Sequence, residues 1–361
     1  MFTLILNLGS TSFKFELFDS ESLRSVQAGN FPMESSGNNI QTQVDKITRD
    51  VLRQVGDIGL IEKIGHRVVH GGDDFFEPTK VTPEILTQLE KQNHLAPLHN
   101  PYNLAGINAC QKYLPNVLNF AVFDTGFFHN LPESAKVYPI PYKYYEQYGI
   151  KKFGFHGISH QFAVSEGCQK AKLDYQKVNI ITVHLGGGCS VAAIEKGKPI
   201  DTSMGLTPLE GLMMQTRSGD IGEGVVIQIL ENLLANDNDI DVQTAINQLR
   251  DILNYNSGIK GISGYSNYLD LLSAVKENQP QAKLTFDMFI HRIKKYIGAY
   301  AAILGSVNLL VFTGQVGAGD PLTRKKVTDK LKILEKTKVV VVEPHEELAI
   351  ARLIKQINTD R

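Results

Sequence analysis

Cysteine is scarce in this 361-residue sequence, which contains three. Cys110, Cys168 and Cys189 lie far apart, and none belongs to a CxxC pair or to a Cys/His spacing typical of a zinc site. An odd number of widely spaced cysteines also gives no support to a disulfide framework. We therefore expect reduced thiols and a cytoplasmic protein.

The sequence also lacks an excess of charge of either sign. Its 37 Lys and Arg residues nearly balance its 38 Asp and Glu residues and leave a net charge of -1. No basic block indicates a nucleic-acid partner, and no acidic tail indicates a solvated segment. Any anion site must therefore be built locally.

Long apolar runs and a signal peptide are missing as well. Ala299 to Phe312 is the most apolar long stretch, but Gly305, Ser306 and Asn308 interrupt it, and it falls short of the roughly 20 apolar residues of a membrane helix. The opening MFTLILNLGS lacks the basic region of a signal peptide and is typical of a strand. The sequence thus predicts no membrane segment and no membrane partner.

Two segments about half the chain apart share one pattern: a strand, a turn of small residues and a second strand. The first runs from Thr3 to Leu17, and the second runs from Ile180 to Ile194 around Gly186-Gly187-Gly188. This repetition predicts a duplicated domain, and a single core rarely grows beyond about 250–300 residues. With helices between the strands, the expected fold class is α/β with mixed sheets.

Several helices can be placed from capping residues and spacing. Thr82 and Pro83 predict a helix start, and apolar residues at helical spacing predict a helix over 286–304. Residues 232–248, rich in Asn and Asp, are expected to form a surface excursion. The last helix is expected to begin near Pro344 and to bury Leu348, Leu353, Ile354 and Ile357.

A third glycine-rich turn, Gly314 to Gly319, follows an apolar strand ending at Thr313. Glycine turns let backbone N–H groups approach phosphate oxygens without a Cβ in the way. Any one such turn is more often an ordinary tight hairpin, but three in one chain favour phosphate binding. None matches GxGxxG opening a helix or GxxxxGK[ST], so neither a Rossmann nor a P-loop fold is predicted.

Two arginines lie in small-residue surroundings that suit anion binding. Arg67 stands in the string GHRVVHGG, and Arg217 stands in QTRSGD. A guanidinium group can hold a carboxylate or a phosphate through two parallel hydrogen bonds. The structural alternative for each arginine is an ion pair with a carboxylate of the fold.

Three further residues are candidates because of their local setting. Asp124 ends an apolar strand, where α/β proteins often place site residues. His99 lies in a loop between two prolines, and His156 lies between an aromatic residue and a glycine. Each could instead be a structural or solvated side chain, but their joint presence in one chain is harder to explain that way.

The quoted strings resemble the acetate kinase family of small-carboxylate kinases, in the same order and over nearly the whole chain. They are GHRVVHGG, LAPLHNP, FDTGFF, YGIKKFGFHGISH, DTSMGLTPLEGLMMQTRSGDI, SGIKGISG and RIKKYIGAYAAILG. The resemblance implies two related actin-like domains of the ASKHA, ribonuclease H-like kind around a central cleft, in a homodimer. We expect an N-terminal domain of residues 1–126 and 348–361 and a C-terminal domain of residues 127–347.

The resemblance also implies a role for each matching position. Arg67, Arg217, His156, His99 and Asp124 would be catalytic, and Asn7 and Glu346 would hold Mg²⁺ or Mn²⁺. The acetate methyl group would lie against Val69, Leu98, Phe155 and Pro208. The nucleotide or phosphate site would comprise Ser10, Ser12, Lys14, His184, Leu185, Gly186, Gly187, Gly188, Tyr268, Asp270, Gly314, Gln315, Val316, Gly317 and Ala318.

The implied reaction is reversible in-line phosphoryl transfer between ATP and acetate, giving acetyl phosphate. Arg67 and Arg217 would hold the carboxylate and the migrating phosphoryl group, and Asp124 would orient Arg67 or the acceptor. A carboxylate attacks as it stands, so no strong general base is required. Phosphoryl transfer depends instead on alignment and on positive charge around the migrating group.

The chain departs from the family pattern at the adenine site. The family has Asp-x-Arg after a serine turn, where this chain has Tyr268-Leu269-Asp270, and Gln315 replaces a glycine. Gly187 replaces an asparagine in the second hairpin. The change at Gly187 keeps the backbone contacts to phosphate. The missing Asp-x-Arg and Gln315 leave three donors open: ATP bound differently, with Tyr268 stacked on the base, another nucleotide, or pyrophosphate.

Two other functions remain open at this stage. One is a propionate or butyrate kinase of the same family, although branched Val69 would narrow the pocket in favour of acetate. One extra methylene changes discrimination by only about 1–3 kcal/mol, so mixed acetate and propionate activity is expected. The other is a catalytically weakened relative that acts as a binding or regulatory protein, against which the full catalytic set argues.

Overall fold

The computed structural model of the chain describes residues 1–9, 12–33, 39–236 and 240–357, and it divides into two compact units. Unit 1 comprises Met1–His129, Phe155–Phe162 and His345–Arg361, and unit 2 comprises Asn130–Gly154 and Ala163–Pro344. The segment Phe155–Phe162 thus lies with the N-terminal unit, whereas the domain bounds expected above place it in the second domain.

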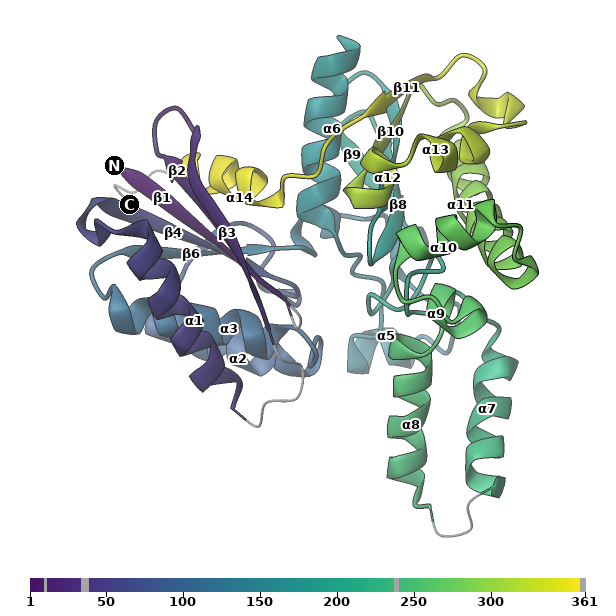
Figure 1. Cartoon of the computed structure of the whole chain (residues 1–361), viewed down its shortest axis with the longest axis horizontal. Helices are drawn as coiled ribbons and strands as arrows, with labels where there is room; N and C mark the ends of the chain where they lie inside the picture. Colours follow the sequence, from purple (N-terminus) through teal and green to yellow (C-terminus); the bar gives the residue numbers. More distant parts are fainter. Residues whose placement is uncertain (10–11, 34–38, 237–239, 358–361) are drawn as a thin grey trace. The chain divides into compact units, whose positions relative to one another are not determined.

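Unit 1 is built on a mixed six-stranded sheet in the order β3-β2-β1-β4-β6-β5 (Figure 1). β1, β2 and β3 form an antiparallel meander, while β4 runs parallel to β1 and β6 runs parallel to β4. The short β5 closes the edge against β6. The strands are β1 Phe2–Leu8, β2 Ser12–Asp19, β3 Ser25–Pro32, β4 Ile61–Val68, β5 Thr79–Lys80 and β6 Leu118–Phe123.

Helices cover both faces of this sheet, and β1 is therefore buried on both sides. On one face, Leu4, Leu6 and Leu8 pack in a core with residues of α1 (Ile40–Val55) and α3 (Asn100–Tyr113). On the other face, α14 (Glu346–Lys355) packs on β1 and β4. Gly65 makes this approach close: a Cβ there would lie 2.7 Å from Ile5 Cδ1 and 2.8 Å from Ile350 Cγ2.

Unit 2 repeats the same plan in a five-stranded sheet of order β11-β10-β7-β8-β9. β7, β8 and β9 form the antiparallel meander, β10 runs parallel to β7, and β11 runs parallel to β10. This repetition confirms the predicted duplication. The strands are β7 Asn179–Leu185, β8 Cys189–Glu195, β9 Lys198–Thr202, β10 Leu309–Thr313 and β11 Lys338–Val341.

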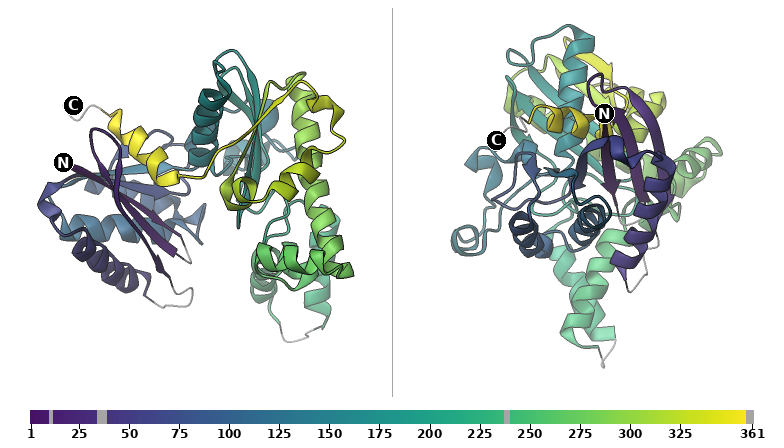
Figure 2. Two further views of the ribbon diagram at one scale, coloured as in Figure 1. Left: turned by 45° about the horizontal axis from the view of Figure 1, so that its top comes forward. Right: turned by 90° about the vertical axis from the view of Figure 1, so that its left-hand side faces the viewer.

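The sheet of unit 2 lies between two helices (Figures 1 and 2). α11 (Pro280–Leu304) packs on β7 and β8, and α6 (Gly157–Ala171) approaches β10, where a Cβ on Gly167 would lie 2.7 Å from Val311 Cγ2. α11 contains the predicted helix 286–304, with Phe286, Phe289 and Ile293 buried. Besides α7 and α8, which are described below, the remaining α-helices of the two units are α2 Pro83–Lys91, α4 Glu133–Lys136, α5 Lys143–Tyr148, α9 Gly258–Ser263, α10 Tyr268–Lys276, α12 Gly314–Gly319 and α13 Pro321–Thr328.

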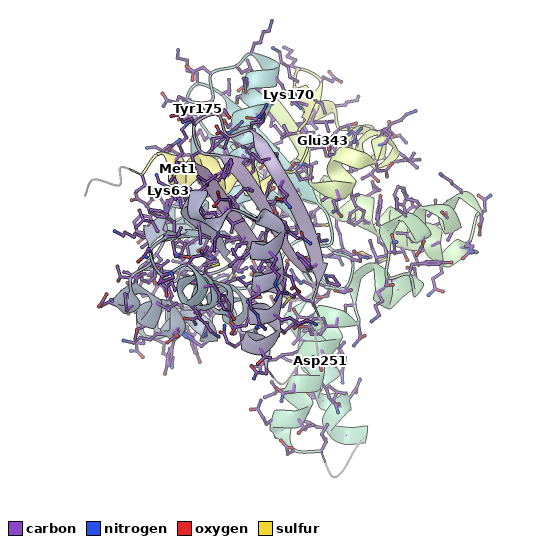
Figure 3. The ribbon with its side chains drawn as sticks, turned by 60° about the vertical axis from the view of Figure 1, so that its left-hand side comes forward. Met1, Lys63, Lys170, Tyr175, Asp251 and Glu343 are labelled. Atoms are coloured by element: carbon purple, nitrogen blue, oxygen red, sulfur yellow. The ribbon has the colours of Figure 1, made fainter. Side chains whose placement is uncertain are left out.

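Two helices of unit 2 form a hairpin, α7 (Glu223–Asn236) and α8 (Val242–Tyr255), that extends away from the sheet of that unit (Figure 1). Asp251, labelled in Figure 3, lies on α8. Much of segment 232–248, expected as a surface excursion, is therefore helical. None of the helices in the described part of the chain combines the length and apolarity needed to cross a bilayer.

The structure confirms the predicted start of α2, agrees in part with the prediction for the last helix, and differs from the turn predicted after β10. Thr82 caps α2, with its hydroxyl accepting a hydrogen bond from the Ile85 N–H, as predicted. The last helix begins at Glu346, and its buried apolar residues include Ile350 and Ile354, while Leu348, Leu353 and Ile357 are half-buried. The glycine-rich segment after β10 is not a turn but helix α12.

Candidate active site

Three strands of unit 1 bring polar side chains to one edge of the sheet. β1, β4 and β6 are parallel neighbours, and near their carboxyl ends lie Asn7, Arg67 and Asp124. The Asp124 carboxylate is buried, and its Oδ2 accepts hydrogen bonds from Arg67 Nε at 3.0 Å and from Nη2 at 2.5 Å. The edge predicted to carry the site therefore holds a fixed arginine.

Arg67 is also linked to the start of α14. Its Nη1 donates to Asn7 Oδ1 at 3.2 Å, and Asn7 Nδ2 donates to Glu347 Oε1 at 2.9 Å. Burial alone would lower the pKa of Arg67, but the negative charges of Asp124, Glu346 and Glu347 outweigh that effect and raise it. Arg67 therefore stays charged, and two of its five N–H groups remain to contact a bound anion.

A metal ion at this edge would have few protein ligands. In the described residues, no group of three or more His, Cys, Asp and Glu side chains is placed to hold one. Asn7 and Glu347 nevertheless bring an amide and a carboxylate together, and Glu346 lies close enough to act on Arg67. Mg²⁺ prefers oxygen ligands and usually keeps several waters with one or two carboxylates, so these residues fit it.

The segment that carries His156 is tied to the same edge. Gly157 N–H donates to Asp124 O at 2.8 Å, and a Cβ on Gly157 would lie 2.2 Å from that oxygen. His156 itself has a φ of 58°, a left-handed conformation that costs a non-glycine residue about 1–2 kcal/mol. Such strain is concentrated at functional sites, which supports His156 as a site residue.

The remaining candidates of unit 1 lie near these residues along the chain or the sheet. The Val69 N–H donates to Asn103 Oδ1 at 3.0 Å and so is held by α3, whose N-cap position is His99. Val69 and Phe155 are buried, but Leu98 is 43% exposed. Lys14 is paired with Asn7 across β1 and β2, and Ser12 begins β2. Ser10 lies outside the described residues.

Unit 2 brings two glycine segments together. β7 and β10 are parallel neighbours, with Thr313 beside His184, so both glycine segments begin at one edge of the sheet. Gly314 has a φ of 79°, and a Cβ there would lie 2.3 Å from Leu185 O. Leu185–Gly188 and Gly314–Gly317 therefore form one surface of mostly small residues, in which Gly186–Gly188, Gln315 and Val316 are exposed or half-buried. Leu185, Gly314 and Gly317 are buried beneath it.

Arg217 lies beside this surface. The Gln215 N–H donates to Gly187 O at 3.3 Å, and Arg217 Nη1 donates to Pro208 O at 3.3 Å. Burial raises the pKa of the Cys189 thiol to about 12, and the nearby charge of Arg217 partly opposes this rise. Cys189 directly follows the glycine turn, so the structure brings Arg217, Pro208 and Gly186–Gly188 together.

Tyr268, which was predicted to lie at a nucleotide site, packs into the core of unit 2. The Tyr268 ring is buried 5.8 Å from the Phe289 ring, and its hydroxyl bonds to Thr323 and, at 3.2 Å, to Asp320. Burial raises the pKa of this hydroxyl, which therefore stays protonated. These contacts join α10, α11 and α13, which makes Tyr268 a structural residue here.

Four other predicted nucleotide-site residues lie within α10 and α12. Asp270 and Gln315 are exposed, while Ala318 is buried in α12. Val316 is half-buried between them in sequence.

Comparisons with known proteins agree on one family. The family model described as the acetokinase family matches residues 25–349. The chain belongs to the acetokinase family. It is 37% identical over 396 residues to the acetate kinase of Halothermothrix orenii, covering 97% of each chain. It is 41% identical over 356 residues to that of Helicobacter acinonychis, covering 92% of this chain and 87% of the relative.

Solved structures of the family share the fold. The acetate kinase of Porphyromonas gingivalis is 33% identical with a TM-score of 0.84, covering 97% of this chain and 98% of that one. A propionate kinase from Francisella tularensis is 30% identical with a TM-score of 0.86, covering 98% of each chain. Together with the repeated sheet plan, these likenesses confirm the predicted fold class of two related actin-like domains.

The predicted site residues of this acetokinase fall into two groups, one in each unit. Unit 1 gathers Asn7, Arg67, Asp124 and the segment at His156, and unit 2 gathers Arg217 with the glycine segments. The convergence of Arg67, His156 and Arg217 on one phosphoryl group stays a prediction.

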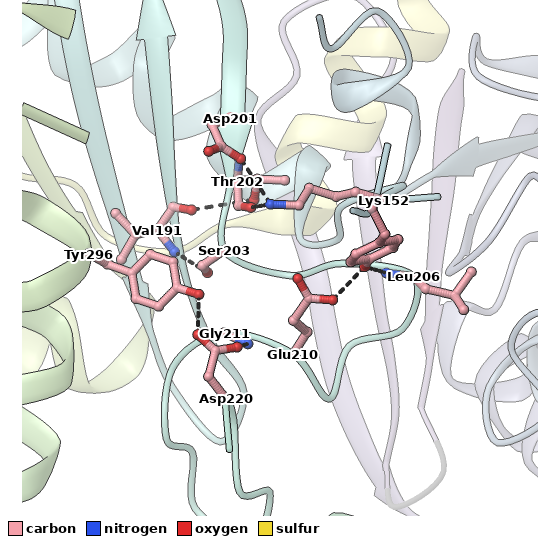
Figure 4. Close-up of polar contacts among 11 residues, drawn as sticks. Lys152, Val191, Asp201, Thr202, Ser203, Leu206, Glu210, Gly211, Asp220 and Tyr296 are labelled. Atoms are coloured by element: carbon pink, nitrogen blue, oxygen red, sulfur yellow. Dashed lines mark hydrogen bonds and ion pairs between the residues drawn. The ribbon is translucent and has the colours of Figure 1, made fainter. Parts of the chain in front are cut away.

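Sequence reasoning missed several polar contacts in these two groups. It named Glu346 and not Glu347, which makes the contact with Asn7. It also missed the hydrogen bond from Tyr138 to Glu210, 2.5 Å long. The hydrogen bond from Tyr296 to Asp220, also 2.5 Å long, was missed as well (Figure 4). Glu210 and Asp220 stand in the quoted strings, but their tyrosine partners lie over 70 residues away and carry no local signal.

Proposed function

We propose that this acetokinase is an acetate kinase, which transfers a phosphoryl group between ATP and acetate and forms acetyl phosphate. The observation that carries the proposal is the Arg67–Asp124 pair at the carboxyl edge of β4 and β6. A charged guanidinium, fixed by a buried carboxylate and with N–H groups to spare, is a ready site for acetate or phosphate oxygens. The family membership supplies the reaction class.

The residues divide the work of an in-line transfer. Arg67 would hold the acetate or the phosphoryl group, with Asp124 orienting it through two hydrogen bonds. Arg217 and His156 would place positive charge and a hydrogen-bond donor where the equatorial oxygens gather charge, with His99 nearby. The attacking carboxylate needs no base, so Asp124 acts by orientation.

Mg²⁺, or Mn²⁺, would be held at the edge of unit 1 by Asn7 and Glu346, with Glu347 orienting the Asn7 amide. A bound divalent cation neutralises charge on the phosphates of the donor. Val69, Leu98, Phe155 and Pro208 would line the pocket for the acetate methyl group. Val69 and Phe155 are already buried, as a small apolar pocket requires.

The donor phosphates would bind the backbone of His184–Gly188 and of Gly314–Ala318, with Ser10, Ser12 and Lys14 on the first hairpin. The contact of Gly314 with Leu185 supports one shared phosphate surface in unit 2. Tyr268 is left out of base stacking because its ring and hydroxyl are engaged in the core. ATP remains the donor proposed for a member of this kinase family, with another nucleotide or pyrophosphate as the alternatives.

Propionate is a second acceptor that one comparison favours, because a propionate kinase shares the fold at 30% identity. A single added methylene changes binding by only about 1–3 kcal/mol, so we expect activity with both acids and a preference for acetate. A kinetic preference for butyrate would overturn the proposed pocket.

We also propose a cytoplasmic homodimer. The three cysteines are buried and free, as a reducing compartment favours. α7 carries seven Val, Ile and Leu side chains, all at least partly exposed, and an apolar helix face of this kind is typical of an interface. Sedimentation equilibrium should give twice the mass of the chain, and a monomer at micromolar concentration would refute the dimer.

The function is tested by trapping acetyl phosphate as its hydroxamate, with ATP and pyrophosphate offered as rival donors. We expect product from acetate, Mg²⁺ and ATP. Product from pyrophosphate alone would reassign the donor while keeping the acceptor. No product with any donor would favour a binding or regulatory protein and would overturn the proposed enzyme.

A further inference from the structure

Arg217 lies in a loop that runs from Gly211 to Asp220. The two ends of this loop, called its neck below, are joined through the Asp220 carboxylate. Asp220 Oδ1 accepts from the Gly211 N–H at 2.7 Å, and the Asp220 N–H donates to Gly211 O at 2.9 Å (Figure 4). Between these residues, Gly219 has a φ of 66°, and a Cβ there would lie 2.3 Å from Leu212 O. The ends of the loop are therefore tightly packed against each other.

This neck is tied to a long helix of unit 2. The Tyr296 hydroxyl donates to Asp220 Oδ2 at 2.5 Å, and Arg292 Nη1 donates to Asp220 O at 2.8 Å. Both side chains come from α11, one helical turn apart, and α11 packs on β7 and β8. Burial raises the pKa of the Tyr296 hydroxyl, and Asp220 raises it further, so Tyr296 remains a donor at neutral pH.

Within the loop, hydrogen bonds hold both the backbone and the guanidinium group of Arg217. The Met214 N–H donates to Arg217 O at 3.1 Å, and the Ser218 N–H donates to Leu253 O at 3.0 Å. The guanidinium donates to Pro208 O, which lies just before the neck. A shift of the neck relative to α11 would therefore move Arg217, and a misplacement of about 1 Å can cost about 10²-fold in rate.

We propose that Asp220 and Tyr296 are positioning residues for Arg217: they clamp its loop to α11 so that the guanidinium is presented to the phosphoryl group in transfer. The inference rests on the proposed function, because it assigns a purpose to the loop through Arg217. Neither residue touches substrate in this account. Their effect should appear in kcat more than in KM, since Arg217 acts in the transition state.

The first test removes the clamp hydroxyl and compares it with a matched hydroxyl on the same helix. Tyr300 lies one turn from Tyr296 with its ring 5.7 Å away, and its buried hydroxyl has no hydrogen-bond partner among the described residues. Tyr296→Phe should lower kcat about 10- to 100-fold with KM for acetate changed less than threefold. Tyr300→Phe should stay within twofold of the parent kcat.

The second test is a double-mutant cycle with Arg217→Ala. If the clamp acts through Arg217, Tyr296→Phe should change kcat less than twofold in the Arg217→Ala background. Asp220→Asn should lower kcat in the same way as Tyr296→Phe, and thermal unfolding of both variants should show that they are folded. A wild-type kcat in Tyr296→Phe, or an equal loss with and without Arg217, would overturn the clamp.

The two proposals fail in different ways. A strongly impaired Arg217→Ala with a fully active Tyr296→Phe would remove the clamp and leave the catalytic role of Arg217 intact. A fully active Arg217→Ala would instead contradict the proposed function of Arg217, and with it the clamp.

Discussion

At the scale of single residues, the buried Arg67–Asp124 ion pair fixes the charge and the position of the Arg67 guanidinium. Arg67 is held in a charged state by a carboxylate that is almost fully buried, and both share the edge where parallel strands end. Removing one partner of such a pair leaves the other charge buried and uncompensated, which is strongly unfavourable. The pair should therefore be sensitive to a change that alters charge but not shape.

Asp124→Asn makes that change. The amide keeps the volume of the side chain but lacks the charge that holds Arg67, so we expect kcat/KM for acetate to fall about 10²-fold through misplacement of the guanidinium. Steady-state kinetics with thermal unfolding as a check on folding would measure it. An Asp124→Asn enzyme with normal constants would remove Asp124 from the site.

His66, the neighbour of Arg67, makes stability depend on pH. Burial, only partly opposed by its hydrogen bond to Asn119, lowers the pKa of His66 to about 4, so the folded protein keeps it neutral while the unfolded chain binds a proton below about 6.5. Folding stability contributed by His66 is thus complete above pH 6.5 and is lost as the pH falls toward 4, by an amount of about 3 kcal/mol.

Urea unfolding between pH 4 and pH 7 tests this dependence. His66→Gln should show a flatter pH profile than the parent protein, whereas replacement of the exposed His94 by Gln should leave the profile unchanged. Identical slopes in the parent and His66→Gln would contradict the assignment.

At the scale of secondary-structure elements, glycine spacing and helix phase decide how closely elements pack. Gly65 of β4 lies against Ile5, Ile350 and Ile354, so any side chain there would press β4 away from α14. Glu346 and Glu347 lie at the start of α14, so the position of α14 on the sheet also affects the carboxylates near Arg67.

Gly65→Ala should destabilise the protein by about 1–3 kcal/mol through overpacking. Ile5→Val, which removes the nearest methyl group, should recover part of that loss in the double variant. Gly298→Ala is the matched control because its Cβ meets no atom within 4 Å, and it should be neutral or stabilising by up to about 1 kcal/mol. Equal unfolding midpoints for Gly65→Ala and the parent protein would contradict the close packing.

Sequence patterns predicted where helices and strands occur better than they predicted which face of a helix is buried. The strand–turn–strand units and α11 were predictable because alternation and helical spacing directly reflect burial. The phase of α14 was predicted only in part: Ile354 is buried as expected, but Leu348 and Leu353 are half-buried. Glu347 and Ile350, which were not predicted, are buried instead. The contact of Glu347 with Asn7 was likewise not predicted, while the role of Glu346 at a metal site stays a prediction.

Long-range polar contacts were beyond sequence reasoning altogether. The residues of the Arg217 loop could be recognised by their strings, but the tyrosines that hold Glu210 and Asp220 come from distant segments. Only the folded chain shows that α12 begins where a turn was predicted, since Gly314 directly follows β10 and opens the helix with a positive φ.

At the scale of the whole molecule, one sheet plan occurs twice and each copy supplies part of the proposed site. Unit 1 contributes a fixed arginine, an oxygen-rich edge and a strained histidine, and unit 2 contributes glycine backbone and a second arginine. Phosphoryl transfer requires positive charge around the migrating group, and each unit contributes one arginine to the proposed catalytic set. Variants in each unit therefore test the proposed catalytic set separately.

The most direct measurement is kcat for acetyl phosphate formation by Arg67→Ala and Arg217→Ala, one variant in each unit. We predict a loss of about 10³-fold or more in each, with thermal unfolding close to that of the parent protein. Replacement of the exposed Arg53 by Ala should leave kcat unchanged. Arg67→Ala or Arg217→Ala within tenfold of the parent kcat would contradict the proposed catalytic role of that arginine.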